Sequence, residues 1–200
     1  DSHWLQRLCQ PLIDGHAQYS YGRQLAGPES HYSESRVFEK YFPAESRIPQ
    51  DGFYCNNANS ALLKESWSRY RFDEELTGLE DMALAQRLVR DGGKVAYVAD
   101  AAVYHPHAET WRQVKRRFER EAIALQQIMP QLHVGLLDTA RYIARSIWRD
   151  ACCAARDGVL ANKASEIARY RFYQYMGSYS GNHQHRKLSH AEKDKYFYPA

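Results

Sequence analysis

The spacing of apolar residues in the first part of the chain predicts both helices and strands. Alternating residues predict a strand over 18–24, and 52–57 is a candidate for a second, short strand. Between them, 26–50 carries Gly, Ser, Pro and charge with poor periodicity and predicts a long loop, which in a compact domain is usually functional or mobile. Helical spacing predicts a short amphipathic helix over 1–12 and a helix over 59–70, from the positions Trp4, Leu5, Leu8, Leu12, Leu62, Leu63 and Trp67.

A helix followed directly by a strand is predicted farther along the chain. The helix runs over about 80–90, and the pair Gly92-Gly93 should stop it, because glycine readily takes the left-handed conformation that ends helices. A strand follows over 94–98, and 101–104 continues it or forms a second short one.

The pattern changes after His107. A polar stretch rich in His and Tyr, 177–200, is expected to form a loosely ordered tail. Before it, helical spacing predicts three helices, the first two rich in Arg, over 109–129, 136–157 and 161–176. We therefore divide the chain near Ala108 into an α/β part, 1–108, and a helical extension, 109–200.

Composition narrows the class of protein. The 200 residues are 44% hydrophobic and 26% charged, as in ordinary globular proteins, and the net charge of +3 is too small to indicate nucleic-acid binding. The four cysteines have no C-x-x-C spacing and indicate reduced thiols in the cytoplasm. The chain has neither a signal peptide nor an apolar run of about 18 residues, so we expect it to lie against a membrane at most. A first residue other than Met suggests a fragment or a processed product.

Two adjacent acids, Glu80 and Asp81, open the predicted helix over 80–90. Acidic residues are favourable in the first turn of any helix, which is the plain explanation for the pair. Their surroundings are more specific. The block 72–88 reads F-D-E-x-L-x-G-x-E-D-x-x-L-A-x-R-L and is similar to the segment of family 2 glycosyltransferases that carries their E-D motif. This resemblance implies that Asp81 is the general base that deprotonates the acceptor hydroxyl, and that Glu80 orients or binds the acceptor.

A carboxylate suits this reaction. Inverting sugar transfer is an in-line displacement in which the hydroxyl proton is lost late, so a positioned base of ordinary carboxylate pKa is adequate. The helix N-terminus is expected to keep Asp81 ionised.

His105 and His107 form an H-x-H on a segment predicted to be extended. Alternate residues of a strand point to the same side, so the two imidazoles can chelate one ion, although packing or hydrogen bonding explains them equally well. The resemblance implies that a histidine here completes a site for Mg²⁺ or Mn²⁺ that holds the nucleotide diphosphate. His105 is the first choice, and His107 matches an H-x-H variant of bacterial members.

Polar residues at two other places resemble parts of the same family. Asn57 and Asn59 lie at a predicted strand-to-helix junction, where Asn and Ser also serve as helix caps. The resemblance places them at the sugar pocket, and amides suit sugar hydroxyls because they both donate and accept hydrogen bonds. In the segment Tyr21-Gly22-Arg23-Gln24, Arg23 would face phosphate or acceptor, or would be an ordinary solvated arginine.

Basic residues on the predicted C-terminal helices suggest a partner. Trp111 opens W-R-Q-V-K-R-R-F-E-R, a pattern that suits a helix at a membrane surface or a buried Trp beside solvated charges. The series Arg141, Arg145 and Arg149 forms one basic face, which suits anionic headgroups, a lipid-linked acceptor or an acidic helix.

The resemblance covers about 1–129 and is specific mainly over 53–107. It implies an α/β fold in which 1–108 is the acceptor-side half of a GT-A-like, Rossmann-like domain. The chain has no D-x-D motif, which in the family grips the metal, and D-S-H-W-L resembles the point just after it. The expected function is transfer of a sugar from a nucleotide-sugar donor to a glycan or lipid-linked acceptor in bacterial polysaccharide synthesis. We expect it in the cytoplasm or at the inner face of the cell membrane.

Two alternatives belong to other classes of protein. One is a non-catalytic module that binds carbohydrate or a membrane surface through the basic helices. The other is a metallohydrolase that uses Asp81, His105 and His107, for which the sequence offers no fourth ligand.

Overall fold

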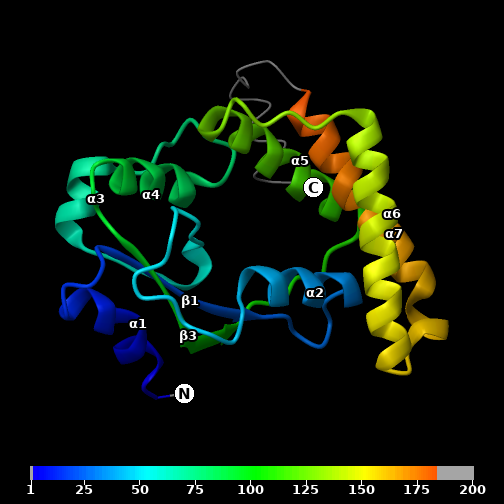
Figure 1. The fold of residues 1–200 in the computed structure, drawn as a ribbon, viewed down its shortest axis with the longest axis horizontal. Helices are drawn as coiled ribbons and strands as arrows, with labels where there is room; N and C mark the ends of the chain where they lie inside the picture. The colour runs from blue at the N-terminus through cyan, green and yellow to red at the C-terminus, as the bar shows by residue number, and fades with distance from the viewer. Residues whose placement is uncertain (1, 184–200) are drawn as a thin grey trace. The chain divides into compact units, whose positions relative to one another are not determined.

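The computed structural model describes residues 2–183, which form a mixed α/β protein (Figure 1). The elements in chain order are α1 (Trp4–Ile13), β1 (Tyr19–Leu25), α2 (Tyr32–Tyr41), the 3₁₀ turn η1 (Asn57–Asn59), β2 (Ser60–Leu62), α3 (Lys64–Tyr70), α4 (Glu80–Arg90), β3 (Val95–Tyr104), α5 (Trp111–Ile128), α6 (Leu136–Arg156) and α7 (Leu160–Asn182). The α/β class expected from the sequence is confirmed.

The chain folds as two units. The sheet unit comprises 1–28, 37–75 and 79–106, and the helical unit comprises 29–36, 76–78 and the described residues from His107 onward. The first half of α2 and the short stretch before α4 therefore belong to the helical unit, although they precede Ala108 in sequence.

The sheet has three strands in the order β2-β1-β3. β1 runs antiparallel to β2 and parallel to β3, and Tyr19 at its start lies opposite Leu62 and Val95. At its far end Leu25 lies opposite Tyr104, after a register shift between Gly22 and Gln24. The parallel β1–β3 pair requires a long crossover connection, which includes α4.

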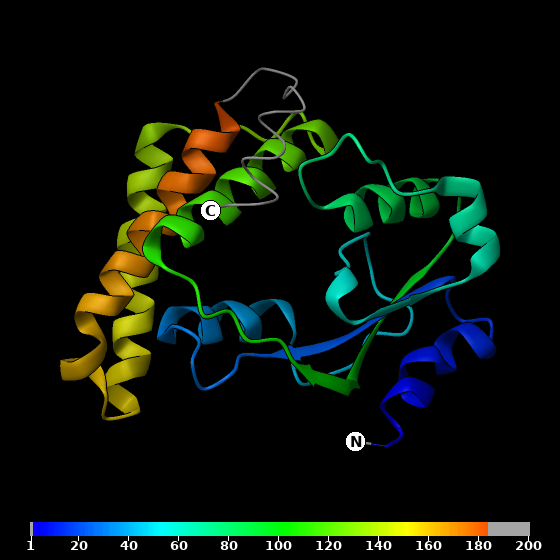
Figure 2. The same cartoon turned by 180° about the vertical axis from the view of Figure 1, so that it is seen from behind.

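Helices cover both faces of this sheet, with α4 on one side and α1 on the other (Figures 1 and 2). Alternate strand residues point to opposite faces. The α4 face is packed by Tyr19, Tyr21, Val95, Tyr97, Leu84 and Leu88, and the α1 face by Leu8, Val98 and Ala101. Burial of a side chain as large as Val or Leu contributes roughly 1.5–3 kcal/mol, so the two faces hold the sheet unit together.

Several predicted elements are confirmed. The helix predicted over 80–90 is α4, and Gly92 beyond it has a φ of 88°. The strand predicted from Lys94 is the single strand β3, which continues without interruption to Tyr104.

The long loop predicted over 26–50 is wrong, because α2 lies within it. The inward side of α2 carries Phe38 together with the buried polar residues Ser33 and Glu34. Because two of the three buried positions of α2 are polar, the apolar period that would predict this helix is lost.

The elements predicted around the Asn-rich segment are wrong in part. No strand forms over 52–57, and the helix predicted over 59–70 begins only at Lys64, after β2. Asn56 caps η1 by accepting a hydrogen bond from the Ala58 N–H, so the capping role expected for one of these polar residues is confirmed.

Three helices, α5, α6 and α7, build most of the helical unit. α7 continues to Asn182, so the loosely ordered tail predicted from Gly177 is wrong for 177–182, whereas 184–200 lies outside the described residues. The helix continues because its glycines fit closely against α5. A Cβ on Gly177 would lie 2.3 Å from the Lys115 carbonyl oxygen, and one on Gly181 would lie 2.2 Å from that of Glu119.

Gly181→Ala is expected to destabilise the protein by roughly 1–3 kcal/mol, because the added methyl group overpacks the α5–α7 contact. The sign is diagnostic, since Ala in an open helix position would stabilise by about 1 kcal/mol relative to Gly. Urea unfolding checks the effect, with the neighbouring Ser180→Ala as control. Unchanged or increased stability in Gly181→Ala would show that the two helices are not in close contact.

Candidate active site

Asp81 lies in the first turn of α4 and is only 6% exposed. Its Oδ2 accepts a hydrogen bond from the Asn57 backbone N–H at 2.7 Å, and its Oδ1 accepts one from the Met82 N–H at 2.7 Å. The Asn57 side-chain oxygen in turn accepts a short hydrogen bond from the Tyr19 hydroxyl. Asp81, Asn57 and Tyr19 thus form one connected group that joins α4, η1 and β1.

Burial raises the pKa of Asp81 to about 6, although the N–H groups of Met82 and Asn57 lower it in part. The negative charge of Glu80, a half-buried residue beside it, raises the pKa further. The pKa of Asp81 is therefore higher than that of an ordinary carboxylate, because desolvation outweighs the N–H groups at the start of α4. A base that titrates near neutral pH is well suited to proton transfer.

The two neighbouring groups that could also lose a proton, the Cys55 thiol and the Tyr19 hydroxyl, do not act as bases near neutral pH. Burial raises the pKa of the Cys55 thiol and of the Tyr19 hydroxyl, and the charge of Asp81 raises both further. Both groups therefore stay neutral at physiological pH, and Asp81 is the member of this trio that changes its charge there.

The backbone immediately before Asp81 is strained. Leu79, the N-cap residue of α4, has a φ of 56° and a ψ of 24°. This is the left-handed region of backbone conformation, which residues other than Gly, Asn and Asp rarely adopt. Such a conformation costs of the order of 1–3 kcal/mol and is typically found at functional sites. Here it fixes the direction in which the chain enters the turn that carries Glu80 and Asp81.

An open pocket of about 400 Å³ lies beside this group and includes Asn57. Its other lining residues are Ser60, Leu62, Lys64, Trp67 and Phe72. Trp67, an apolar position of the helix predicted from the sequence, is 37% exposed, with the Arg71 guanidinium 3.8 Å from its ring centroid. Aromatic rings beside amide, hydroxyl and ammonium groups are the combination that binds small polar ligands with apolar faces, such as sugars.

Asn59 has a structural role in the sheet unit. It is 2% exposed, and its Nδ2 donates to the carbonyl oxygens of Arg23 and Ala101 while its Oδ1 accepts from the Trp4 indole N–H. A Cβ on Gly22 would lie 2.4 Å from Asn59 Nδ2, so this contact requires glycine. Both N–H groups of the Asn59 amide are therefore used by protein carbonyls and the residue is buried, which contradicts its expected role in sugar binding.

Arg23 lies at the register shift between β1 and β3 and is half-buried, so it is not an ordinary solvated arginine. Its Nε is buried and has no hydrogen-bond partner among the described residues. The predicted role of Arg23 toward phosphate or acceptor stays a prediction.

The two histidines do not share a strand as expected, because β3 ends at Tyr104. His105 belongs to the sheet unit, where its N–H donates to the Leu25 carbonyl and its ring lies edge-on to Phe38. His107 belongs to the helical unit, where its Nδ1 lies 2.8 Å from Glu34 Oε1.

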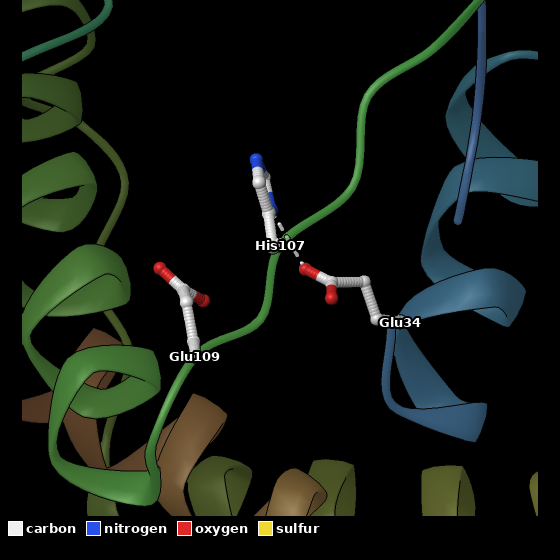
Figure 3. A group of neighbouring side chains, drawn as sticks. All are labelled: Glu34, His107 and Glu109. Atoms are coloured by element: carbon white, nitrogen blue, oxygen red, sulfur yellow. Dashed lines mark hydrogen bonds and ion pairs between the residues drawn. The ribbon is translucent and has the colours of Figure 1, made fainter. Parts of the chain in front are cut away.

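His107 forms a group with Glu34 of α2 and Glu109, whose ligand atoms all lie within 4.8 Å of one another (Figure 3). Neither Asp81 nor His105 belongs to this group, so the metallohydrolase alternative loses its proposed ligand set. An imidazole and two carboxylates are suitable ligands for a transition-metal ion such as Mn²⁺, whereas Mg²⁺ prefers oxygen ligands alone.

Arg117 already neutralises this group. Its Nη2 lies 2.6 Å from Glu34 Oε1, and its Nε donates to Glu109 Oε2 at 3.0 Å. Burial alone would raise the pKa of Glu34, but the hydrogen bond from His107 and the charge of Arg117 outweigh it and lower that pKa. A divalent ion would have to displace the guanidinium, so these residues do not fit a resident metal, and we derive no chemical step through one.

Mn²⁺ is therefore expected to change the free energy of unfolding by less than about 0.3 kcal/mol, whereas an ion at a hundred times its Kd stabilises by about 2.7 kcal/mol. Thermal unfolding with and without MnCl₂ checks this, with Ca²⁺ as ionic-strength control. Stabilisation by Mn²⁺ that disappears in His107→Ala would show that the group binds metal after all.

The sequence analysis did not select several residues that lie at the Asp81 group, at the adjacent pocket or at the His107 group. They are Tyr19, Lys64, Phe72, Glu34 and Arg117. Only Tyr19 carried a local signal, as an apolar position on the inward face of a predicted strand. The others are brought to their partners by tertiary folding, as Glu34 and Arg117 are 83 residues apart in sequence.

Comparison with known proteins finds no matching family model, curated protein or solved structure. Among the described helices, none is long and apolar enough to cross a membrane.

Proposed function

We propose that the protein is part of an inverting glycosyltransferase, with Asp81 as the general base and the adjacent pocket as the binding site for the acceptor sugar. One observation carries the proposal: a buried carboxylate with a pKa of about 6 accepts a hydrogen bond from the backbone N–H of Asn57, and Asn57 lines an open pocket together with Trp67 and Phe72. The order of the E-D pair and the Asn-rich turn, similar to family 2 glycosyltransferases, supports the same conclusion.

The proposed reaction is a single displacement. An acceptor hydroxyl in the pocket transfers its proton to Asp81 while its oxygen forms a bond to the anomeric carbon of the donor sugar. The bond from that carbon to the diphosphate oxygen breaks on the opposite face, and the nucleoside diphosphate leaves with the electron pair. The configuration at the anomeric carbon is inverted.

The neighbouring residues support proton transfer in this scheme. The Asn57 and Met82 N–H groups hold both carboxylate oxygens of Asp81, which fixes the base before the acceptor binds. In the pocket, Trp67 offers a face for the apolar side of a sugar ring, and Asn57 and Ser60 offer polar groups for its hydroxyls. The donor is a nucleotide sugar, and its D-x-D site has no counterpart in this chain.

Titration with sugars, followed by the tryptophan indole N–H signals in NMR, tests the pocket. The probes are UDP-glucose, GDP-mannose, dTDP-rhamnose and a panel of disaccharides. We expect at least one of them to shift the Trp67 signal, assigned with Trp67→Phe, and Asn57→Ala to weaken that binding about tenfold through loss of hydrogen bonding.

Asn56→Ala is the matched control, because Asn56 caps the same turn but is absent from the pocket lining. It should leave the affinity within about threefold of the wild type, since a lost cap costs stability and not a ligand contact. If no probe shifts the Trp67 signal, or if both asparagine variants weaken binding equally, the proposed acceptor site is wrong.

A further inference from the structure

α6 has one side that packs within the helical unit and one that faces solvent. On the packed side, Asp150 is fully buried and paired with Arg171 of α7, and Thr139 and Ala154 are buried with it. At 3.6 residues per turn, the residues about half a turn away must point outward. These outward residues are unusually apolar for a solvent-facing side.

Leu137, Ala140, Ala144 and Trp148 follow one another at spacings of three and four residues, and all four are exposed. Leu137 and Trp148 are each 73% exposed, and Leu136 at the start of the helix is 64% exposed. Single exposed apolar residues are ordinary, but a continuous row of them marks an interaction surface.

Arg141, Arg145 and Arg149 form a second row directly beside the first, each one residue beyond Ala140, Ala144 and Trp148. All three are exposed. The ion pair of Arg141 with Asp138 is solvent-exposed, with a distance of 3.7 Å, and such pairs contribute little. The three positive charges of this row are therefore available to a partner.

We propose that this outward side of α6, defined by the apolar row and the arginine row, is a docking surface for an anionic lipid bilayer. A helix lying in the membrane interface places Leu and Trp at the headgroup–acyl boundary, while the long arginine side chains reach lipid phosphates. Both rows lie on one helix, so one orientation satisfies them together.

The arrangement favours lipid over a second copy of the chain. Pairing two identical surfaces through their apolar rows would bring two arginine rows close together, which is unfavourable. An anionic bilayer accepts both rows, because it offers an apolar layer directly beneath a negative one. This inference does not depend on the proposed sugar transfer, since no residue of α6 lies in the candidate active site.

Flotation with lipid vesicles tests the proposal on the whole chain. We expect the protein to bind vesicles of phosphatidylcholine and phosphatidylglycerol at 7:3, to bind pure phosphatidylcholine at least tenfold more weakly, and to dissociate from the anionic vesicles as salt is raised. The double variant Arg145→Glu/Arg149→Glu should lose at least about tenfold in affinity for the anionic vesicles.

The matched control is Arg90→Glu/Arg112→Glu, which makes the same change in net charge at two exposed arginines outside α6. It should retain affinity within about threefold of the wild type, because the apolar row and the arginine row of α6 are both intact in this variant. Equal losses in the two double variants would mean that only net charge matters, and would overturn the docking surface. Absence of binding to anionic vesicles would overturn it as well and would favour a protein partner.

A second measurement separates insertion from loose electrostatic adsorption. Vesicles that contain brominated lipid quench the fluorescence of a tryptophan lying at the headgroup–acyl boundary. We expect most of the quenching to disappear in Trp148→Phe and to persist in Trp67→Phe, whose indole belongs to the sheet unit. Quenching that is unchanged in Trp148→Phe would place another part of the chain at the membrane.

Discussion

Asp81→Asn is expected to lower the turnover of sugar transfer by about 10²–10⁴-fold, the usual contribution of a general base, while donor affinity changes less than about threefold. Asn keeps the size of the side chain but cannot accept the acceptor proton. Steady-state kinetics and donor titration measure the two effects separately. The exposed Asp51→Asn is the control, and it should leave both quantities unchanged.

The same variant has a defined effect on stability. The pKa of Asp81 is raised from 3.8 to about 6 by burial, so the folded protein holds a proton there that the unfolded chain has released. This contribution to stability is fully present below pH 3.8 and is lost as pH rises through about 6. A shift of about two pKa units corresponds to roughly 3 kcal/mol.

Relative to the wild type, Asp81→Asn should therefore gain about 2–3 kcal/mol between pH 4 and pH 7.5, because the variant lacks this titration. Urea unfolding of both proteins at the two pH values measures the change. Parallel pH dependences would show that the pKa of Asp81 is not raised. A carboxylate that lowers stability at neutral pH and is nevertheless essential for turnover would be a functional residue.

Asp150→Ala is expected to destabilise the protein by about 3–5 kcal/mol, since it leaves a buried arginine charge without its partner. Arg171 donates to both carboxylate oxygens of Asp150, at 2.7 and 3.0 Å, and the two side chains are 4% and 1% exposed. Typical domains have 5–15 kcal/mol of stability, so this loss is a large fraction. Urea unfolding at pH 7 measures it.

The double variant Asp150→Leu/Arg171→Met removes the whole ion pair. It therefore distinguishes the loss of the pair from the effect of leaving one buried charge without its partner. Replacing both partners by apolar residues is expected to cost less than Asp150→Ala alone, because no charge remains buried and uncompensated. A double variant that is less stable than Asp150→Ala would contradict this explanation and would mean that the contacts of Arg171 with Gln174 and Ser33 dominate.

The sequence predicted the elements whose signals are local. α4 has a helical apolar period, two acids at its start and a glycine stop, and β3 has an apolar run, so both were found close to their true ends. α2 was missed because Ser33 and Glu34, although polar, are buried. Its stability depends on partners elsewhere in the chain, which no local pattern contains.

The candidate site, like the fold, was predicted only where its signals are local. Asp81 and Asn57 were selected from adjacent motifs, and the structure joins them by a hydrogen bond. Asn59 has the same residue type two positions later, yet it points into the sheet and is used by Trp4 and Ala101. The raised pKa of Asp81 could not be predicted, because it results from burial of the side chain, which the sequence does not show.

The proposed docking surface of α6 shows the opposite case. The repeat of Arg141, Arg145 and Arg149 was visible in the sequence, but only the structure shows that Leu137 and Trp148 are exposed beside it. Helical periodicity alone would place those two apolar residues in the core. Exposure is a tertiary property, and here it changes the interpretation of the whole helix.

The release of nucleoside diphosphate from nucleotide sugars in the presence of acceptor glycans is the direct test of the proposed sugar transfer. The protein is incubated with the donor panel and the disaccharides, and both released nucleotide and extended glycan are quantified, with the anomeric configuration determined by NMR. We predict acceptor-dependent release with inversion, reduced at least a hundredfold in Asp81→Asn. Lack of turnover and of binding with every donor, or transfer undiminished in that variant, would contradict the account.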